Sequence, residues 1–122
     1  MENKLLTKRE QLIMEILWNQ GKELTANEVF HYAGNVSIYT IQQVLQRLLK
    51  MNYVEVSGIE CHKKSIARKY RPTISQADYI SNSVNLQTRH QLASNYIQSS
   101  NDMSSLDELE QLIKAKKEEL GE

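Results

Sequence analysis

The spacing of apolar residues predicts two short helices at the start of the chain. In residues 8–20, the apolar side chains that share one helical face are Leu12, Ile13, Ile16 and Leu17. In residues 26–33, the side chains expected to face inward are Val29, Tyr32 and Ala33. Both helices start with the capping-box pattern, formed by Thr7 with Glu10 and by Thr25 with Glu28. Each is followed by a glycine, which commonly ends a helix: Gly21 and Gly34.

A third helix with a continuous apolar face is predicted after Ser37, a favourable N-cap residue. Its apolar positions keep helical spacing over two turns: Ile41, Val44, Leu45, Leu48 and Leu49. The helix is expected to end near Met51 and Asn52. Two β-prone segments follow, residues 53–56 and 68–71, joined by a long loop over residues 57–67. A hairpin is therefore predicted, and the length of its loop leaves the register open.

The second half of the chain predicts helices with interrupted apolar faces. Pro72, the only proline, marks the expected boundary between a domain over residues 1–72 and a region over residues 73–122. A fourth helix is expected after Ser75, with residues 99–102 as a turn behind it. A last helix, capped by Ser105 and Glu108, is expected to carry these apolar residues on one side: Leu106, Leu109, Leu112, Ile113 and Leu120.

Three short helices followed by a hairpin is the element order of a winged helix-turn-helix. We therefore expect a mainly α fold with a small β-hairpin, in which a winged-helix DNA-binding domain precedes a helical dimerisation region. Two amphipathic helices cannot bury much apolar surface by themselves, so we expect a second copy of the chain to cover them. The alternative is that they fold back on the winged helix. The expected dimerisation residues are Ile80, Val84, Leu92, Tyr96, Leu106, Leu109, Leu112 and Ile113.

Composition and charge narrow the class of protein. The chain has 122 residues, of which 40% are hydrophobic and 25% charged, as in soluble globular proteins. No apolar run is long enough to cross a bilayer, no signal peptide is evident, and a single cysteine excludes an internal disulfide. A cytoplasmic protein without a membrane partner is expected. The net charge of zero divides unevenly, since residues 1–72 carry +4 and residues 73–122 carry −4. Only the first half is thus expected to approach a polyanion.

The outer side of the third helix has the chemistry of a DNA-reading surface. The residues opposite its apolar face are Tyr39, Gln43, Gln46 and Lys50, flanked by Thr40, Gln42 and Arg47, with Ser37 at the helix start. Gln pairs with adenine and Arg with guanine in the major groove. No acidic residue occurs from Gly34 to Val54, so no carboxylate of this segment would repel phosphate. The alternative is an ordinary solvated helix face.

The hairpin predicts a basic wing. Five basic residues fall within residues 63–71: Lys63, Lys64, Arg68, Lys69 and Arg71. As a group they would hold phosphate or enter the minor groove, whereas the alternative is a solvated loop. Cys61 and His62 lack the further ligands that zinc needs, and no catalytic motif is present. We therefore expect no metal, no cofactor and no enzyme activity. The alternative is a small helical enzyme.

Several segments together resemble the penicillinase-repressor family of winged-helix transcription repressors: residues 13–18, 24–29, 36–37, 40–41, 46–48 and 106–112. The resemblance extends over essentially the whole chain. It implies a homodimer that binds double-stranded DNA at an inverted-repeat operator. It also implies an antibiotic response in which a sensor system or protease cleaves the tail. Asn95-Tyr96 is the candidate cleavage site, and the alternative is a Tyr buried at the dimer seam.

The chain departs from that family in ways that qualify the expectation. Gln42 and Gln43 replace the more usual pair, so base preference is expected to differ. The hairpin is longer and more basic, and Asn52 stands where a glycine often occurs. No cysteine follows Cys61, which argues against copper sensing through the tail. The main alternative function is a winged-helix adaptor that binds a protein partner and not DNA.

Overall fold

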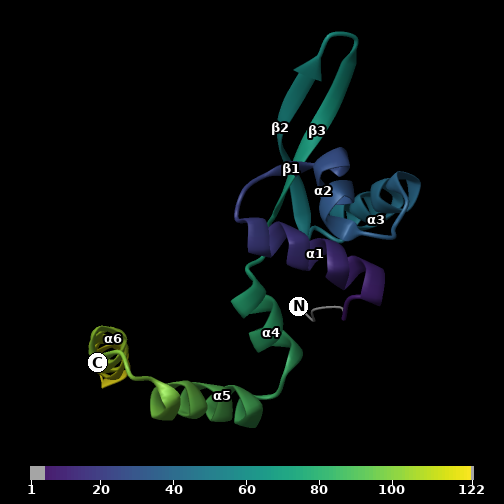
Figure 1. The fold of residues 1–122 in the computed structure, drawn as a ribbon. Helices are drawn as coiled ribbons and strands as arrows, with labels where there is room; N and C mark the ends of the chain where they lie inside the picture. The colour runs from purple at the N-terminus through teal and green to yellow at the C-terminus, as the bar shows by residue number, and fades with distance from the viewer. Residues whose placement is uncertain (1–4, 122) are drawn as a thin grey trace. The chain divides into compact units, whose positions relative to one another are not determined.

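The chain divides into two compact units, the first ending at Ser83 and the second beginning at Val84. The computed structural model describes residues 5–121, and Figure 1 shows the order of the elements. The sequence placed the boundary at Pro72. The structure differs because the helix after Pro72 is anchored to the first unit by Tyr79, a buried aromatic residue of its core.

Three helices form the body of the first unit, with the bounds that their caps predict. They are α1 (Lys8–Gln20), α2 (Ala26–Ala33) and α3 (Ile38–Lys50). Both capping boxes are confirmed: Glu10 N donates to Thr7 Oγ1 at 3.2 Å, and Thr7 N donates to Glu10 Oε1 at 2.9 Å. Thr25 and Glu28 repeat this exchange at the start of α2. Gly21 ends α1 with a φ of 65°, in the left-handed region that glycine adopts readily.

The core lies between these helices and the base of the sheet. Among its fully buried side chains are Ile13, Leu17, Leu24, Ile41, Leu45 and Leu48. The expected apolar faces of α1 and α3 are therefore the core faces, although Leu12 and Leu49 are only partly buried. The expectation for α2 was partly wrong. Tyr32 is 49% exposed, and Phe30 packs against the core in its place beside the fully buried Val29.

A three-stranded antiparallel sheet completes the first unit. Its strands are β1 (Leu24–Thr25), β2 (Val54–His62) and β3 (Ser65–Pro72), in the order β1-β3-β2. His62 pairs with Ser65, so only Lys63 and Lys64 form the turn. The expected long loop over residues 57–67 is therefore wrong. A bulge between Val56 and Gly58 interrupts the alternation of side chains that would have revealed a long strand.

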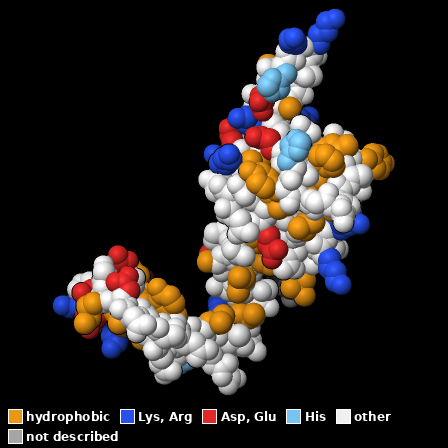
Figure 2. All heavy atoms as spheres, in the orientation of Figure 1, with side chains coloured by type: hydrophobic (Ala, Val, Ile, Leu, Met, Phe, Trp, Pro, Cys, Tyr) orange, Lys and Arg blue, Asp and Glu red, His pale blue; other side chains and the backbone are white. Residues whose placement is uncertain are grey.

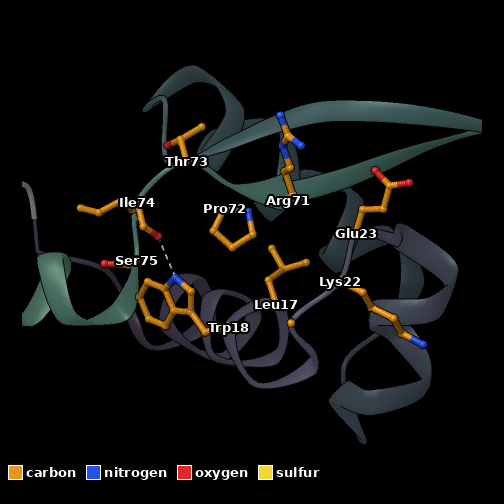
Figure 3. A pocket seen from close by; sticks show the side chains of 10 residues that line it. Leu17, Trp18, Lys22, Glu23, Arg71, Pro72, Thr73, Ile74 and Ser75 are labelled. Carbon is orange, nitrogen blue, oxygen red and sulfur yellow. Dashed lines mark hydrogen bonds between the residues drawn. The ribbon is translucent and has the colours of Figure 1, made fainter.

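The segment after β3 is held on the back of α1. The indole Nε1 of Trp18 donates to the carbonyl oxygen of Ile74 at 2.8 Å (Figure 3). Next comes α4 (Gln76–Ser83), whose Tyr79 ring lies 5.7 Å from that of Trp18 and whose hydroxyl accepts from Leu6 N at 3.1 Å. A cavity of about 560 Å³ remains between Leu17, Trp18, Pro72 and Ile74. These contacts fix the segment over residues 73–75, which leads into α4.

The second unit consists of α5 (Leu86–Ser99) and α6 (Met103–Gly121). The sequence predicted one fourth helix carrying Ile80, Val84, Leu92 and Tyr96. The structure interrupts it after Ser83, because Asn85 caps a new helix by accepting from Thr88 N at 2.8 Å. The start of the last helix was also misplaced, since Asp102 accepts from Ser104 N at 3.1 Å and the helix begins at Met103. None of the described helices is long and apolar enough to span a membrane.

Candidate nucleic-acid interface

The outer side of α3 is open to solvent. The exposed predicted site residues on this helix are Tyr39, Gln42, Gln43, Gln46, Arg47 and Lys50. Ser37 caps the helix by accepting from Thr40 N at 3.1 Å, and its hydroxyl donates to Thr40 Oγ1 at 3.0 Å. The buried face opposite anchors the helix through Ile41, Val44, Leu45 and Leu48. α3 therefore presents a row of amide and basic side chains from a rigid support.

Arg47, a predicted site residue of α3, forms an ion pair within the protein. Its Nε lies 3.1 Å from Glu10 Oε2, and the Arg47 side chain remains 52% exposed while that of Glu10 is 8% exposed. The sequence did not predict this pair, because 37 positions separate the two residues. The pair turns Arg47 toward α1, so its Nε is occupied and only its other guanidinium nitrogens are available to a ligand.

Glu10 links α1 to α3 through its ionised form. Burial acts to raise the pKa of Glu10, but the Thr7 N–H and the Arg47 guanidinium together hold it below its ordinary value. A carboxylate whose pKa is lowered by folding stabilises the folded chain above its unfolded pKa. That contribution is lost as the pH falls through the folded pKa.

We therefore expect Glu10→Gln to lower the free energy of unfolding at pH 7 by about 1 kcal/mol, because the amide keeps the cap but loses the charge. Below pH 4.5, the ordinary value, the two proteins should converge as the wild-type carboxyl becomes protonated. Urea denaturation followed by circular dichroism at pH 7, 5, 4 and 3 measures this. The hydrogen bond from the Thr25 N–H lowers the pKa of Glu28. Both proteins contain Glu28, so its titration cancels in the difference between them. If the two proteins differed in free energy of unfolding by the same amount at every pH, the ionised form of Glu10 would not be what stabilises the fold.

The basic residues of the hairpin lie at its tip and along β3. Of the five basic residues predicted for the wing, two are paired: Lys69 Nζ lies 3.8 Å from Glu23 Oε1, and Arg71 Nε lies 2.5 Å from Glu55 Oε2. Lys63, Lys64 and Arg68 are exposed and have no ion-pair partner among the described residues. In Figure 2, blue side chains stand alone at the hairpin tip, and blue and red side chains mix nearer its base.

At Lys63, the effect of a positive charge on DNA binding can be measured without a loss of folding stability. Its φ of 46° lies in the left-handed region that glycine prefers. Lys63→Gly should thus leave the free energy of unfolding unchanged or raise it by up to about 1 kcal/mol. The same change should weaken binding to every duplex and reduce the slope of log affinity against log salt by about one per subunit. Fluorescence anisotropy at four salt concentrations measures the slope, with Lys63→Arg as the control. An unchanged slope would remove Lys63 from the interface.

A groove joins α3 to the hairpin. It has a volume of about 420 Å³ and is lined by Ala26, Gln42, Gln46, Ile66, Ala67, Arg68 and Tyr70. The structure therefore brings together Gln42, Gln46 and Arg68, which the sequence had assigned to two separate elements. It also adds Ile66, which falls in the segment predicted as a loop, and Tyr70, which falls in a predicted strand but was not among the predicted site residues. Amide, guanidinium and apolar groups in one concave surface can contact base edges, phosphate and sugar.

Cys61 and His62 lie near the tip of the same hairpin. Both are exposed, and His62 Nε2 lies 2.6 Å from Glu60 Oε1. Across residues 5–121, no three His, Cys, Asp or Glu side chains gather into a group that could hold a metal ion. Cys61 lies on the exposed surface of β2.

The predicted dimerisation residues fall into three places. Ile80 lies in α4 and is 42% exposed, and Val84 lies between helices. In the second unit, a groove of about 510 Å³ is lined by Leu106, Leu109 and Ile113 together with Ile97, Glu110, Lys114 and Lys117. Leu92, Tyr96 and Leu112 are exposed large apolar residues outside that lining. Sequence reasoning missed Ile97, whose position on α5 lies outside the expected seam.

The candidate cleavage site lies inside a helix. Asn95 and Tyr96 belong to α5, and both are exposed, Tyr96 to 54%. The alternative, a Tyr that a second chain buries at the dimer seam, stays a prediction.

Comparison with known proteins identifies related sequences. The family described as penicillinase repressor matches residues 6–118. No curated protein matches the chain. Among solved structures, the adhesin competence repressor (AdcR) from Streptococcus pyogenes is similar at 14% sequence identity, with 94% of this chain and 80% of that chain covered and a TM-score of 0.45.

Proposed function

Because the chain belongs to the penicillinase repressor family, we propose that it is a transcription repressor that binds an inverted-repeat operator as a homodimer. The groove shared by α3 and the hairpin carries this proposal. It unites Gln42 and Gln46 with Arg68, which has no ion-pair partner within residues 5–121. Glutamine can form a bidentate pair with adenine in the major groove, while an arginine beside it can neutralise phosphate.

The homodimer is supported by what the second unit leaves uncovered. Neither α5 nor α6 buries a single residue within the chain. Their exposed apolar side chains are Leu86, Leu92, Tyr96, Ile97, Met103, Leu112, Ile113 and Leu120. Apolar stripes of this extent are usually covered by a partner. A second copy supplies an identical surface, and a two-fold arrangement matches the two halves of an inverted repeat.

We propose an antibiotic-responsive sensor or protease that ends repression by cutting the tail, with Asn95-Tyr96 as the candidate bond. Because the backbone of a helix is hydrogen-bonded within the helix, α5 has to unfold locally before a protease can cleave there. Separation of the DNA-binding unit from the dimerising unit would then remove the second operator contact.

A selection from a randomised duplex pool tests the proposal against the adaptor alternative. The full-length protein is incubated with the pool, and bound fragments are amplified and sequenced over several rounds. We expect an enriched core with two-fold symmetry, whose affinity falls steeply with salt as phosphate contacts require. The absence of any enriched sequence, together with no salt-dependent binding, would favour the adaptor.

A further inference from the structure

The bulge in β2 sorts the side chains of the hairpin onto two different faces. Val56 pairs with Tyr70, but after the bulge Ile59 pairs with Arg68 and Cys61 with Ile66. Directly paired residues in an antiparallel ladder point to the same side. One face, here called the apolar wing face, therefore consists of Val56, Ile59, Cys61, Ile66, Arg68 and Tyr70. Without the bulge, Gly58 and Glu60 would take the places of Ile59 and Cys61.

Charge is segregated between the two faces. The hairpin's acidic residues, Glu55 and Glu60, pair in register with Arg71 and Ala67 on the opposite face. Glu55 and Glu60 lie within 2.6 Å of Arg71 and His62, respectively. The apolar wing face has no carboxylate, and its cation, Arg68, has no ion-pair partner in the described part of the chain. A polyanion would therefore meet no repulsion on this face.

The apolar wing face extends beyond what the protein covers. At its base, Tyr70 is 6% exposed and belongs to the core. Towards the tip, Ile59 is 63% exposed and Ile66 is 73% exposed. Ile66 and Arg68 line the groove shared with α3, so the exposed part continues the surface that carries the proposed function. Side chains that only held phosphate would be polar or basic, which does not account for two exposed isoleucines.

We infer that the apolar wing face enters the minor groove beside the site read by α3 and makes the protein prefer an A/T-rich sequence there. Isoleucines pack against deoxyribose and base steps of the minor groove, where other proteins insert apolar side chains. Arg68 pairs with Ile59 and lies two residues from Ile66 on β3. Arginine favours the narrow, strongly negative minor groove of A/T tracts. This inference rests on the proposed function, because it requires the same duplex to occupy α3.

The test repeats the duplex selection with three proteins: wild type, the double variant Ile59→Ser with Ile66→Ser, and the opposite-face control His62→Ser. Wild type and control should enrich a core flanked by A/T-rich segments. The double variant should enrich the same core without the flanks, and its affinity for the A/T-flanked duplex should fall about tenfold. Urea denaturation of each variant checks that the substitutions leave the free energy of unfolding close to that of wild type. Flanks that persist in the double variant, or are absent with wild type, would overturn the inference while leaving the proposed function standing. A pool without any enriched core would overturn both.

Cys61, the only cysteine of the chain, reports directly on the same face. Its rate of alkylation by iodoacetamide should fall about tenfold or more when the selected A/T-flanked duplex saturates the protein, because the thiol then faces the groove. The double variant should show weaker protection at the same fractional saturation. An unchanged rate with bound duplex would overturn the inference and leave this face open to a protein partner.

Discussion

Replacing Leu109 with Asp is expected to convert the dimer into monomers and to lower affinity for the selected duplex by about a hundredfold or more. Leu109 lines the groove between α5 and α6 together with Ile97 and Ile113. A two-fold interface contains each substitution twice, so two carboxylates would be buried without partners. A monomer binds only one half-site, so binding at one half-site no longer holds a second copy of α3 near the other half-site. Sedimentation velocity measures the oligomeric state, and fluorescence anisotropy measures affinity.

Gln111→Asp is the matched control for this variant. It adds the same charge to α6 at an exposed position outside the groove. The control should stay dimeric and keep wild-type affinity for the duplex. A Leu109→Asp protein that sediments as a dimer would remove this groove from the interface. A monomer with undiminished affinity would show that pairing of the tails does not support DNA binding.

Replacing Gln46 with Ala should lower affinity for the selected duplex by at least about tenfold, with little change for mixed-sequence DNA. Gln46 is exposed on α3 and lines the groove with Arg68. A bidentate contact to adenine contributes roughly 1–3 kcal/mol of discrimination, and mixed DNA does not offer that contact in register. Competition between the two duplexes, measured by anisotropy at one salt concentration, gives the ratio of affinities directly.

Gln11→Ala serves as the control for loss of a surface amide. Gln11 is exposed on α1, and its Nε2 donates to Glu15 Oε1 at 3.3 Å, a contact within one helix. Its removal should leave both affinities unchanged. If Gln46→Ala weakened selected and mixed duplexes equally, Gln46 would be a general contact and would not read bases.

Much of the first unit could be predicted from the sequence, because its helices are determined by local signals. Thr7, Thr25 and Ser37 each cap a helix by accepting the N–H three residues later, an interaction encoded within four positions. Spacing alone then distinguished the buried and exposed sides of α3. Belonging to the penicillinase repressor family agrees with this reading of the fold.

The features that were missed depend on contacts distant in sequence or on local irregularity. The Arg47–Glu10 pair joins two helices, and nothing near either residue indicates it. The bulge at Val56 and Gly58 hid the long strands. It therefore also hid the groove and the apolar wing face. The break before α5 depends on Asn85 acting as a cap, a signal that the apolar residues on either side of it concealed.

Binding of a homodimer to an inverted repeat requires two copies of α3 to lie in successive major grooves of one duplex. Dimethyl sulfate methylates guanine N7 in the major groove, so protection of the selected duplex from methylation tests that arrangement directly. At saturating protein, we expect two blocks of protected guanines with centres about 10–10.5 base pairs apart, or a multiple of that spacing. A duplex that is fully bound while every guanine N7 stays reactive, or that shows one protected block, would contradict the account.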